Sequence, residues 1–199
     1  MISVDINAAQ ATQGVPQGTQ PPRSWYALRA FRRQVYKIKE DFDSKGYETF
    51  MALRQTKETK NGHEIHKDEQ IIPQLLFVNC DIPALEAYKS THDKDFMVYR
   101  HKVQDKGGFP VLRPAPIPTE QMQAFIYYVT LEGGNDIEYY GDTMPLFEEG
   151  ERVRVTDGIY KGATGFVKRI KKDRKLLVAI EGVAVVAISH IPMTYLQKV

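Results

Sequence analysis

Residues 150–170 constrain the fold more than any other part of the sequence. Valines alternate with arginines over residues 152–155, and this period of two predicts a half-buried strand. Asp157-Gly158 follows, where glycine accepts the positive φ of a tight turn. A second strand is predicted from Phe166. The stretch therefore predicts a strand, a glycine-rich loop and a strand, which need further strands to cover them.

Those further strands are present in the last part of the sequence. Residues 175–180 and 183–188 are rich in valine and isoleucine, and Glu181-Gly182 separates them as a turn. Residues 195–196 supply one more short strand. Five short strands in about fifty residues fit a small closed β-barrel, because closure removes exposed strand edges.

The front half of the chain alternates predicted strands and helices. Val35, Ile38 and Phe42 share one face of a predicted helix, and Gly46 follows its last turn. Such alternation with adjacent antiparallel strands predicts an α+β sandwich. The predicted strands are 24–30, 47–53, 71–78 and 96–103, and the predicted helices are 32–45, 83–91 and one capped by Thr119.

Residues 54–70 are polar and contain Asn61-Gly62, a strong hairpin signal, so we predict a protruding charged hairpin. His63 and His66 stand three residues apart, one fewer than in a zinc-binding His-Glu-x-x-His helix, and they lie on a strand. Cys80 lies at the end of an apolar strand, which predicts a buried and unreactive thiol. We therefore expect no enzyme activity, no metal and no cofactor.

Composition divides the chain into four parts. Residues 1–22 are poor in large apolar groups, so we expect a disordered tail. A first domain is expected over 23–130 and a second over 149–199. The linker between them, residues 131–148, has five acidic and no basic residues. The second domain is basic, and its loop 168–175 is either a solvated surface or a contact for nucleic acid or an acidic partner.

The single cysteine excludes a disulfide framework and favours a reducing compartment. No apolar run reaches the roughly 18 residues that cross a membrane, and no secretory signal is visible. We expect a cytoplasmic protein that acts as a monomer.

The second domain resembles the KOW motif, which occurs in the NusG family of transcription elongation factors and in ribosomal proteins. Its carrying residues are Val153, Asp157, Gly158, Gly162, Gly165 and Val167. Residues 25–129 resemble the amino-terminal domain of NusG, through Trp25-Tyr26, Pro73, residues 76–78 and residues 118–125. This pairing is more specific than either part alone, and it implies a NusG-type α/β sandwich followed by an SH3-like barrel.

At two places the sequence departs from the usual NusG pattern and is closer to a specialised branch of that family. The usual Phe-Pro-Gly-Tyr is Ile72-Pro73-Gln74-Leu75 here, and residues 120–125 follow the proline-rich segment 113–118. Both features resemble the UpxY-like antiterminators of polysaccharide operons.

The resemblance implies binding to the clamp helices of the RNA polymerase largest subunit, through a concave apolar surface that receives a helical tip. Residues that could form it by position are Phe77, Leu75, Tyr99, Arg29 and Phe31. The alternative for Phe77 and Leu75 is an ordinary core position. Lys89, His92 and Lys94 are candidates for contacts with non-template DNA or nascent RNA, or they are plain surface groups.

The resemblance further implies an antitermination factor that suppresses pausing and termination, for one operon. The alternatives are a general NusG-like factor, whose barrel binds termination factor Rho or a small-subunit ribosomal protein, and an RNA- or ribosome-binding KOW protein.

Overall fold

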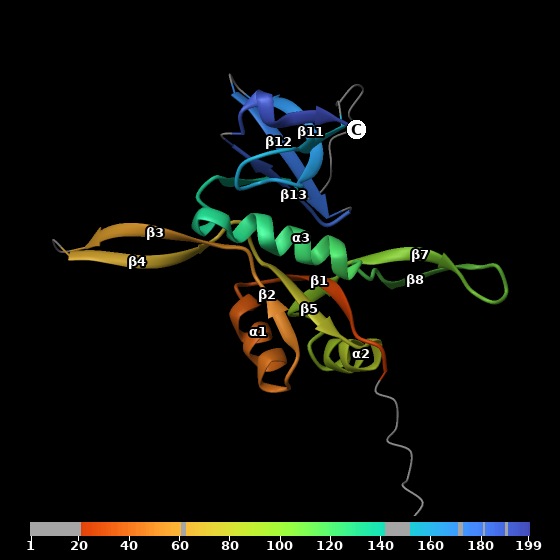
Figure 1. The fold of residues 1–199 in the computed structure, drawn as a ribbon. Coiled ribbons are helices and arrows are strands. Elements are labelled where there is room, and N and C mark those ends of the chain that lie inside the picture. Colours follow the sequence, from red (N-terminus) through yellow and green to blue (C-terminus); the bar gives the residue numbers. More distant parts are fainter. Residues whose placement is uncertain (1–20, 61–62, 142–151, 171–172, 181, 190) are drawn as a thin grey trace, which may run out of the picture.

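The computed structural model describes residues 21–60, 63–141, 152–170, 173–180, 182–189 and 191–199. Most of the expected tail, the Asn61-Gly62 turn, residues 142–148 of the expected linker and part of the basic loop 168–175 lie outside these ranges. Within them the chain is mixed α/β, with antiparallel sheets and few helices. Helix α3 lies between two sheets, and two hairpins project from opposite sides (Figure 1).

The first sheet has four antiparallel strands in the order β2-β5-β1-β6. They span Glu48–Phe50 (β2), Leu75–Cys80 (β5), Ser24–Ala30 (β1) and Phe96–Val98 (β6). The strand predicted over 24–30 is confirmed, and β1 is the element around which the sheet is arranged. The strand predicted over 71–78 begins later, because Leu75 N donates to Ile72 O and Gln74 adopts a φ of 59°.

Helices cover both faces of this sheet. Helices α1 (Val35–Ser44) and α2 (Ile82–Thr91) pack on one face, which carries alternate residues of the strands, among them Tyr26, Leu28 and Val78. Asp81 caps α2 by accepting a hydrogen bond from Ala84 N at 2.8 Å. Helix α3 (Thr119–Thr130) packs on the other face, followed by a short 3-10 turn, η1 (Leu131–Gly134). Helix α1 begins three residues later than predicted, since Arg32 and Arg33 both have positive φ.

Two hairpins leave the first sheet. Strands β3 (Leu53–Lys60) and β4 (His63–Gln70) form the predicted polar hairpin. The strand predicted over 96–103 is divided at Tyr99: β6 pairs with β1, whereas β7 (Arg100–Gln104) pairs with β8 (Pro110–Pro114). Neither hairpin pairs with another strand among the described residues.

The second sheet has six antiparallel strands in the order β14-β10-β11-β12-β13-β9. The predicted strands of the last part of the chain are confirmed as β10 (Arg152–Val155), β11 (Thr164–Ile170), β12 (Asp173–Ile180), β13 (Ala184–Ile188) and β14 (Leu196–Lys198). A 3-10 turn, η2 (Met193–Tyr195), precedes the last strand.

The sixth strand comes from the segment expected to be a linker. Strand β9 (Ile137–Gly141) pairs with β13, and Glu138 forms an ion pair of 2.6 Å with the nearly buried ammonium of Lys175. The end strands β14 and β9 are not paired with each other in the described residues, so the closed barrel expected from the sequence is not seen.

Two glycines of the second sheet have distinct physical roles. Gly158 has a φ of 79° at the predicted Asp157-Gly158 turn, where Asp157 Oδ1 accepts from its amide at 2.8 Å. Gly165 lies in β11, and a Cβ there would stand 2.1 Å from the carbonyl oxygen of Leu177 in β12. Gly165 therefore permits the close approach of two backbones.

Candidate functional site

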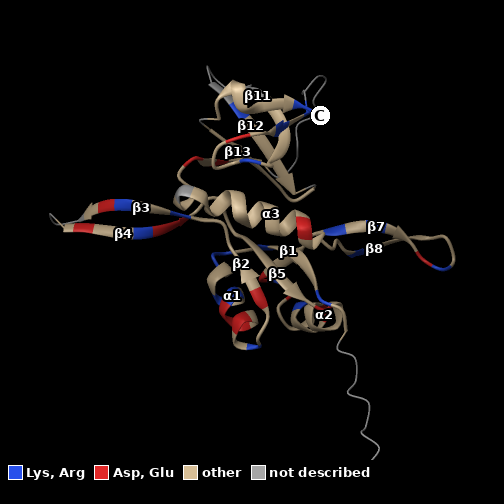
Figure 2. Cartoon of the chain, in the orientation of Figure 1, with Lys and Arg blue, Asp and Glu red and all other residues tan. Residues whose placement is uncertain are grey.

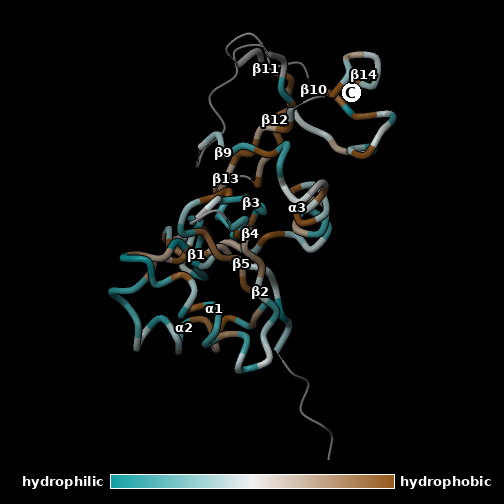
Figure 3. Tube along the Cα trace, turned by 90° about the vertical axis from the view of Figure 1, so that its left-hand side faces the viewer, coloured by the Kyte–Doolittle hydropathy of each residue, from teal (hydrophilic) through white to brown (hydrophobic). Residues whose placement is uncertain are grey.

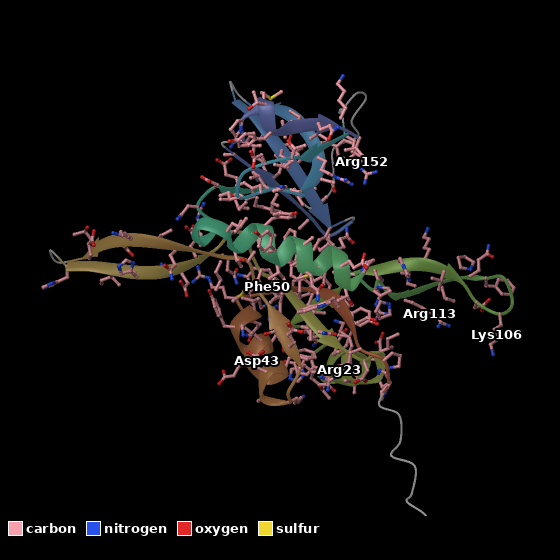
Figure 4. All side chains as sticks on the ribbon, viewed as in Figure 1. Arg23, Asp43, Phe50, Lys106, Arg113 and Arg152 are labelled. Atoms are coloured by element: carbon pink, nitrogen blue, oxygen red, sulfur yellow. The ribbon has the colours of Figure 1, made fainter. Side chains whose placement is uncertain are left out.

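The face of the first sheet that carries α3 holds the apolar residues expected to form a concave surface. Phe77 and Leu75 are fully buried there, with 0% and 1% of their surface exposed. The ring of Phe77 packs against Phe125 of α3, with centroids 5.6 Å apart, and Phe50 completes this aromatic cluster beneath the helix (Figure 4). In this structure Phe77 and Leu75 occupy core positions.

The same face continues past α3 into a partly open surface. Arg29 Nε donates to Tyr99 Oη at 2.9 Å, and both side chains are half-buried. Met97 is the cross-strand neighbour of Arg29 and is 42% exposed, while Phe31 directly after β1 is 40% exposed. Arg29, Phe31, Met97 and Tyr99 are called the open surface below. Met97 was missed from the sequence, because only the β1–β6 register brings it beside Arg29.

A strained turn borders the open surface. Arg29 Nη1 donates to Pro73 O at 3.1 Å, and Ala30 N donates to Gln74 O at 2.9 Å. Gln74 has a left-handed backbone, which favours glycine. Its Oε1 is buried and has no hydrogen-bond partner within the described ranges. This turn fixes the guanidinium of Arg29 against the end of β5.

The three residues proposed to contact nucleic acid differ in availability. Lys89 Nζ donates to Asp93 O at 2.7 Å and to Phe96 O at 2.5 Å, and it pairs with the Asp93 carboxylate. The hydrogen bond from Lys89 lowers the pKa of Asp93. The His92 ring stacks on Tyr88 with centroids 4.2 Å apart. The side chains of Lys89 and His92 are thus engaged in contacts at the carboxyl end of α2. Of the three residues, Lys94 is the exposed cation.

The second sheet packs on the side of α3 that faces away from the first. Gln121 Nε2 donates to Ala179 O at 3.3 Å, and the rings of Tyr128 and Tyr160 lie 6.5 Å apart. A groove of about 900 Å³ remains between α3 and strands β11 and β12. Figure 3 shows α3 between the two sheets from a second direction. Helix α3 and the second sheet are therefore in direct contact, but a groove is left unfilled between them.

Chemistry-bearing side chains do not converge elsewhere in the described part of the chain. No group of three or more histidine, cysteine or acidic residues could hold a metal ion there, and His63 and His66 lie exposed on β4. Burial, with a smaller contribution from Asp81, raises the pKa of the Cys80 thiol to about 12. Among the described helices, none is long and apolar enough to cross a membrane.

The fold thus combines an α+β unit, whose sheet carries helices on both faces, with a second unit that is a β-sheet. The family model described as "Transcription termination factor nusG" matches residues 23–126, slightly more than half of the chain. The chain belongs to the NusG family of transcription termination and antitermination factors.

Individual relatives are more distant. The chain is 25% identical over 174 residues to the "Transcription termination/antitermination protein NusG" of Borreliella burgdorferi, which covers 80% of this chain and 89% of that protein. A solved structure described as "Domain interaction in Thermotoga maritima NusG" shares 17% identity, with a TM-score of 0.45 over 89% of this chain and 97% of that one.

Proposed function

We propose that the protein is an antitermination factor that binds the clamp helices of RNA polymerase through the open surface and suppresses pausing and termination. The observation that carries this proposal is the Arg29–Tyr99 contact at 2.9 Å, with exposed Phe31 and Met97 beside it. Arginine and tyrosine are enriched among the residues that contribute most to protein–protein binding, and here their side chains are joined beside two exposed apolar groups. Family membership supports RNA polymerase as the partner, and hence the cytoplasm as the place of action.

The mechanism needs only a difference in affinity between two states of polymerase. A factor that binds the elongating state ten-fold more tightly than the paused state changes the ratio of the two states ten-fold, which corresponds to a free-energy shift of about 1.4 kcal/mol. The departures at Ile72-Pro73-Gln74-Leu75 favour an UpxY-like role at one polysaccharide operon. A general NusG-like role is the second candidate.

The second sheet is proposed to be a KOW-type unit that binds a further protein. Residues 149–199 are its proposed bounds, with 23–130 for the first domain. The strand order β14-β10-β11-β12-β13 and the glycines at 158 and 165 support this assignment. Rho and a small-subunit ribosomal protein are the candidate partners of such a unit. This unit packs on α3, so binding of a further protein to it is expected to alter its contact with that helix.

The first test is capture of a purified clamp-helix fragment by the full chain. The second is single-round transcription on templates that contain a pause site. Phe31→Ala and Met97→Ala are expected to weaken capture and to restore pausing. Tyr36→Ala is the matched control, because Tyr36 is 54% exposed and belongs to α1, the helix that packs on the opposite face of the sheet. Equal capture by all three variants would refute the assignment of this surface. Transcript profiling of a deletion strain separates action at one operon from general action.

A further inference from the structure

The β7–β8 hairpin differs in charge from the other hairpin. Residues 100–114 contain four basic residues and one acidic residue, whereas residues 53–70 contain four of each. The β3–β4 hairpin pairs its charges internally, as Arg54 with Glu69 at 3.1 Å and Lys57 with Glu64 at 3.7 Å. Figure 2 shows the mixed colours of β3–β4 against the mainly basic β7–β8.

Three cations of the β7–β8 hairpin are available to a ligand. Arg100 at its base is held by Glu86 at 2.9 Å. The others, Lys102, Lys106 and Arg113, are exposed and have no ion-pair partner within the described part of the chain. Figure 4 shows Lys106 at the tip and Arg113 on the arm, both pointing away from the body of the molecule.

The single acid of the hairpin is used by its own turn. Asp105 Oδ1 accepts from Gly107 N at 2.9 Å and from Phe109 N at 2.8 Å, and Asp105 N donates to Phe109 O at 2.9 Å. These bonds satisfy the carboxylate and order the tip, with Gly108 at a φ of 79°. The negative charge is therefore directed at the backbone, and the arm presents its positive charges outward.

The ordered tip holds an aromatic ring in solvent. Phe109 is 70% exposed, the most exposed of the large apolar residues in the described ranges. A Cβ on Gly107 would lie 3.2 Å from Phe109 Cδ2, so the ring rests against a residue without a side chain. Leaving such a ring exposed forgoes the hydrophobic stabilisation that its burial would contribute.

An exposed ring among unpaired cations fits one class of ligand best. Single-stranded nucleic acid offers base faces that stack on aromatic side chains and phosphates that pair with lysine and arginine. A folded acidic protein would satisfy the cations but gives no reason for a bare ring at the tip. The hairpin begins at Arg100, directly after Tyr99 of the open surface, and projects beyond the body of the molecule (Figure 1).

We infer that the β7–β8 hairpin binds single-stranded nucleic acid, with Phe109 stacking on a base and Lys102, Lys106 and Arg113 contacting phosphates. This site is distinct from Lys89 and His92, whose side chains close α2. The inference does not rest on binding to polymerase, because the isolated protein is sufficient to test it.

The experiment measures binding of the full chain to a fluorescent 12-nucleotide oligomer of mixed sequence, as DNA and as RNA, over a range of salt. Three phosphate contacts predict a slope of log K against log salt of about −2. Phe109→Leu is expected to weaken binding about ten-fold without changing that slope. The double variant Lys106→Gln with Arg113→Gln is expected to make the slope shallower by about 1.4.

Two controls make the result specific to the hairpin. Lys67→Gln removes an exposed cation from β4 and is expected to leave affinity and slope unchanged. Thermal unfolding of each variant checks that the fold is intact, since every altered side chain is exposed. Similar affinity for DNA and RNA supports stacking and phosphate contacts alone, and a preference identifies the natural ligand. Binding that is insensitive to Phe109→Leu, or tighter binding of duplex than of single strands, overturns the inference.

Discussion

The ring of Phe125 on α3 lies 5.6 Å from the ring of Phe77 on β5, centroid to centroid. Helix α3 thereby fills the apolar face on which a polymerase helix was expected to sit. On the same face Arg29 and Tyr99 are half-buried, and Phe31 and Met97 are exposed. We therefore expect stability and partner binding to depend on different residues of one sheet face.

Phe77→Ala is expected to lower the free energy of unfolding by about 3–5 kcal/mol, since it empties the space beside the rings of Phe50 and Phe125. Phe31→Ala should change it by no more than about 0.5 kcal/mol, because the side chain is 40% exposed. Urea unfolding followed by tryptophan fluorescence measures both, with Trp25 buried as the reporter. A small loss for Phe77→Ala would mean that this face is not closed in solution.

Gln74→Gly is expected to stabilise the protein by about 0.5–1 kcal/mol. Gln74 holds a φ of 59°, which glycine adopts without strain, and its buried Oε1 is removed at the same time. The matched control is Gln104→Gly in β7, where the backbone is extended and the same change should destabilise slightly. Thermal unfolding compares the two, and a lower melting temperature for Gln74→Gly would show that the turn is not strained.

Gly165→Ala is expected to destabilise the second sheet by about 3 kcal/mol or more. The new Cβ would lie 2.1 Å from the Leu177 carbonyl oxygen, and a backbone atom cannot move aside as a flexible side chain does. Amide hydrogen exchange over β10–β13 should rise, while exchange in β1 and β5 rises less. Thr164→Ala, one residue away and exposed, is the control, and it should cost at most about 1 kcal/mol. Unchanged exchange in the glycine variant would contradict the close approach of β11 and β12.

Cys80 is expected to resist thiol reagents at pH 8. Burial raises the pKa of its thiol to about 12, so the reactive thiolate is scarce until the protein unfolds. Because the folded pKa lies above the unfolded value of about 8.5, the neutral thiol favours the folded state. That contribution is complete below pH 8.5 and is lost as the pH rises toward 12. Labelling rates with and without denaturant measure this protection, and equal rates would place Cys80 at the surface.

Local patterns predicted most of the elements in the first domain. The strand at Trp25-Tyr26 and the polar hairpin were placed correctly, because each is encoded by side-chain period and turn residues nearby. The last helix was also predicted, but Thr119 is its first residue and not its cap, since Pro118 occupies the cap position without a side-chain hydrogen bond. The candidate site was predicted only in part. Arg29, Phe31 and Tyr99 lie on the open surface, whereas Phe77 and Leu75 lie beneath α3, and no local pattern distinguishes a covered apolar face from an open one.

The sequence by itself determined the order of most strands and helices, and the apolar face of each predicted helix. Only the tertiary structure decided that residues of the expected linker form β9 and pair with β13 of the second sheet. It also decided that pairing with the first sheet ends before Tyr99, after which the chain forms the β7–β8 hairpin. It also decided that α3 is covered on both sides. The physical reason is that strand pairing and helix packing join residues far apart in the sequence, and those contacts compete for the same edges and faces.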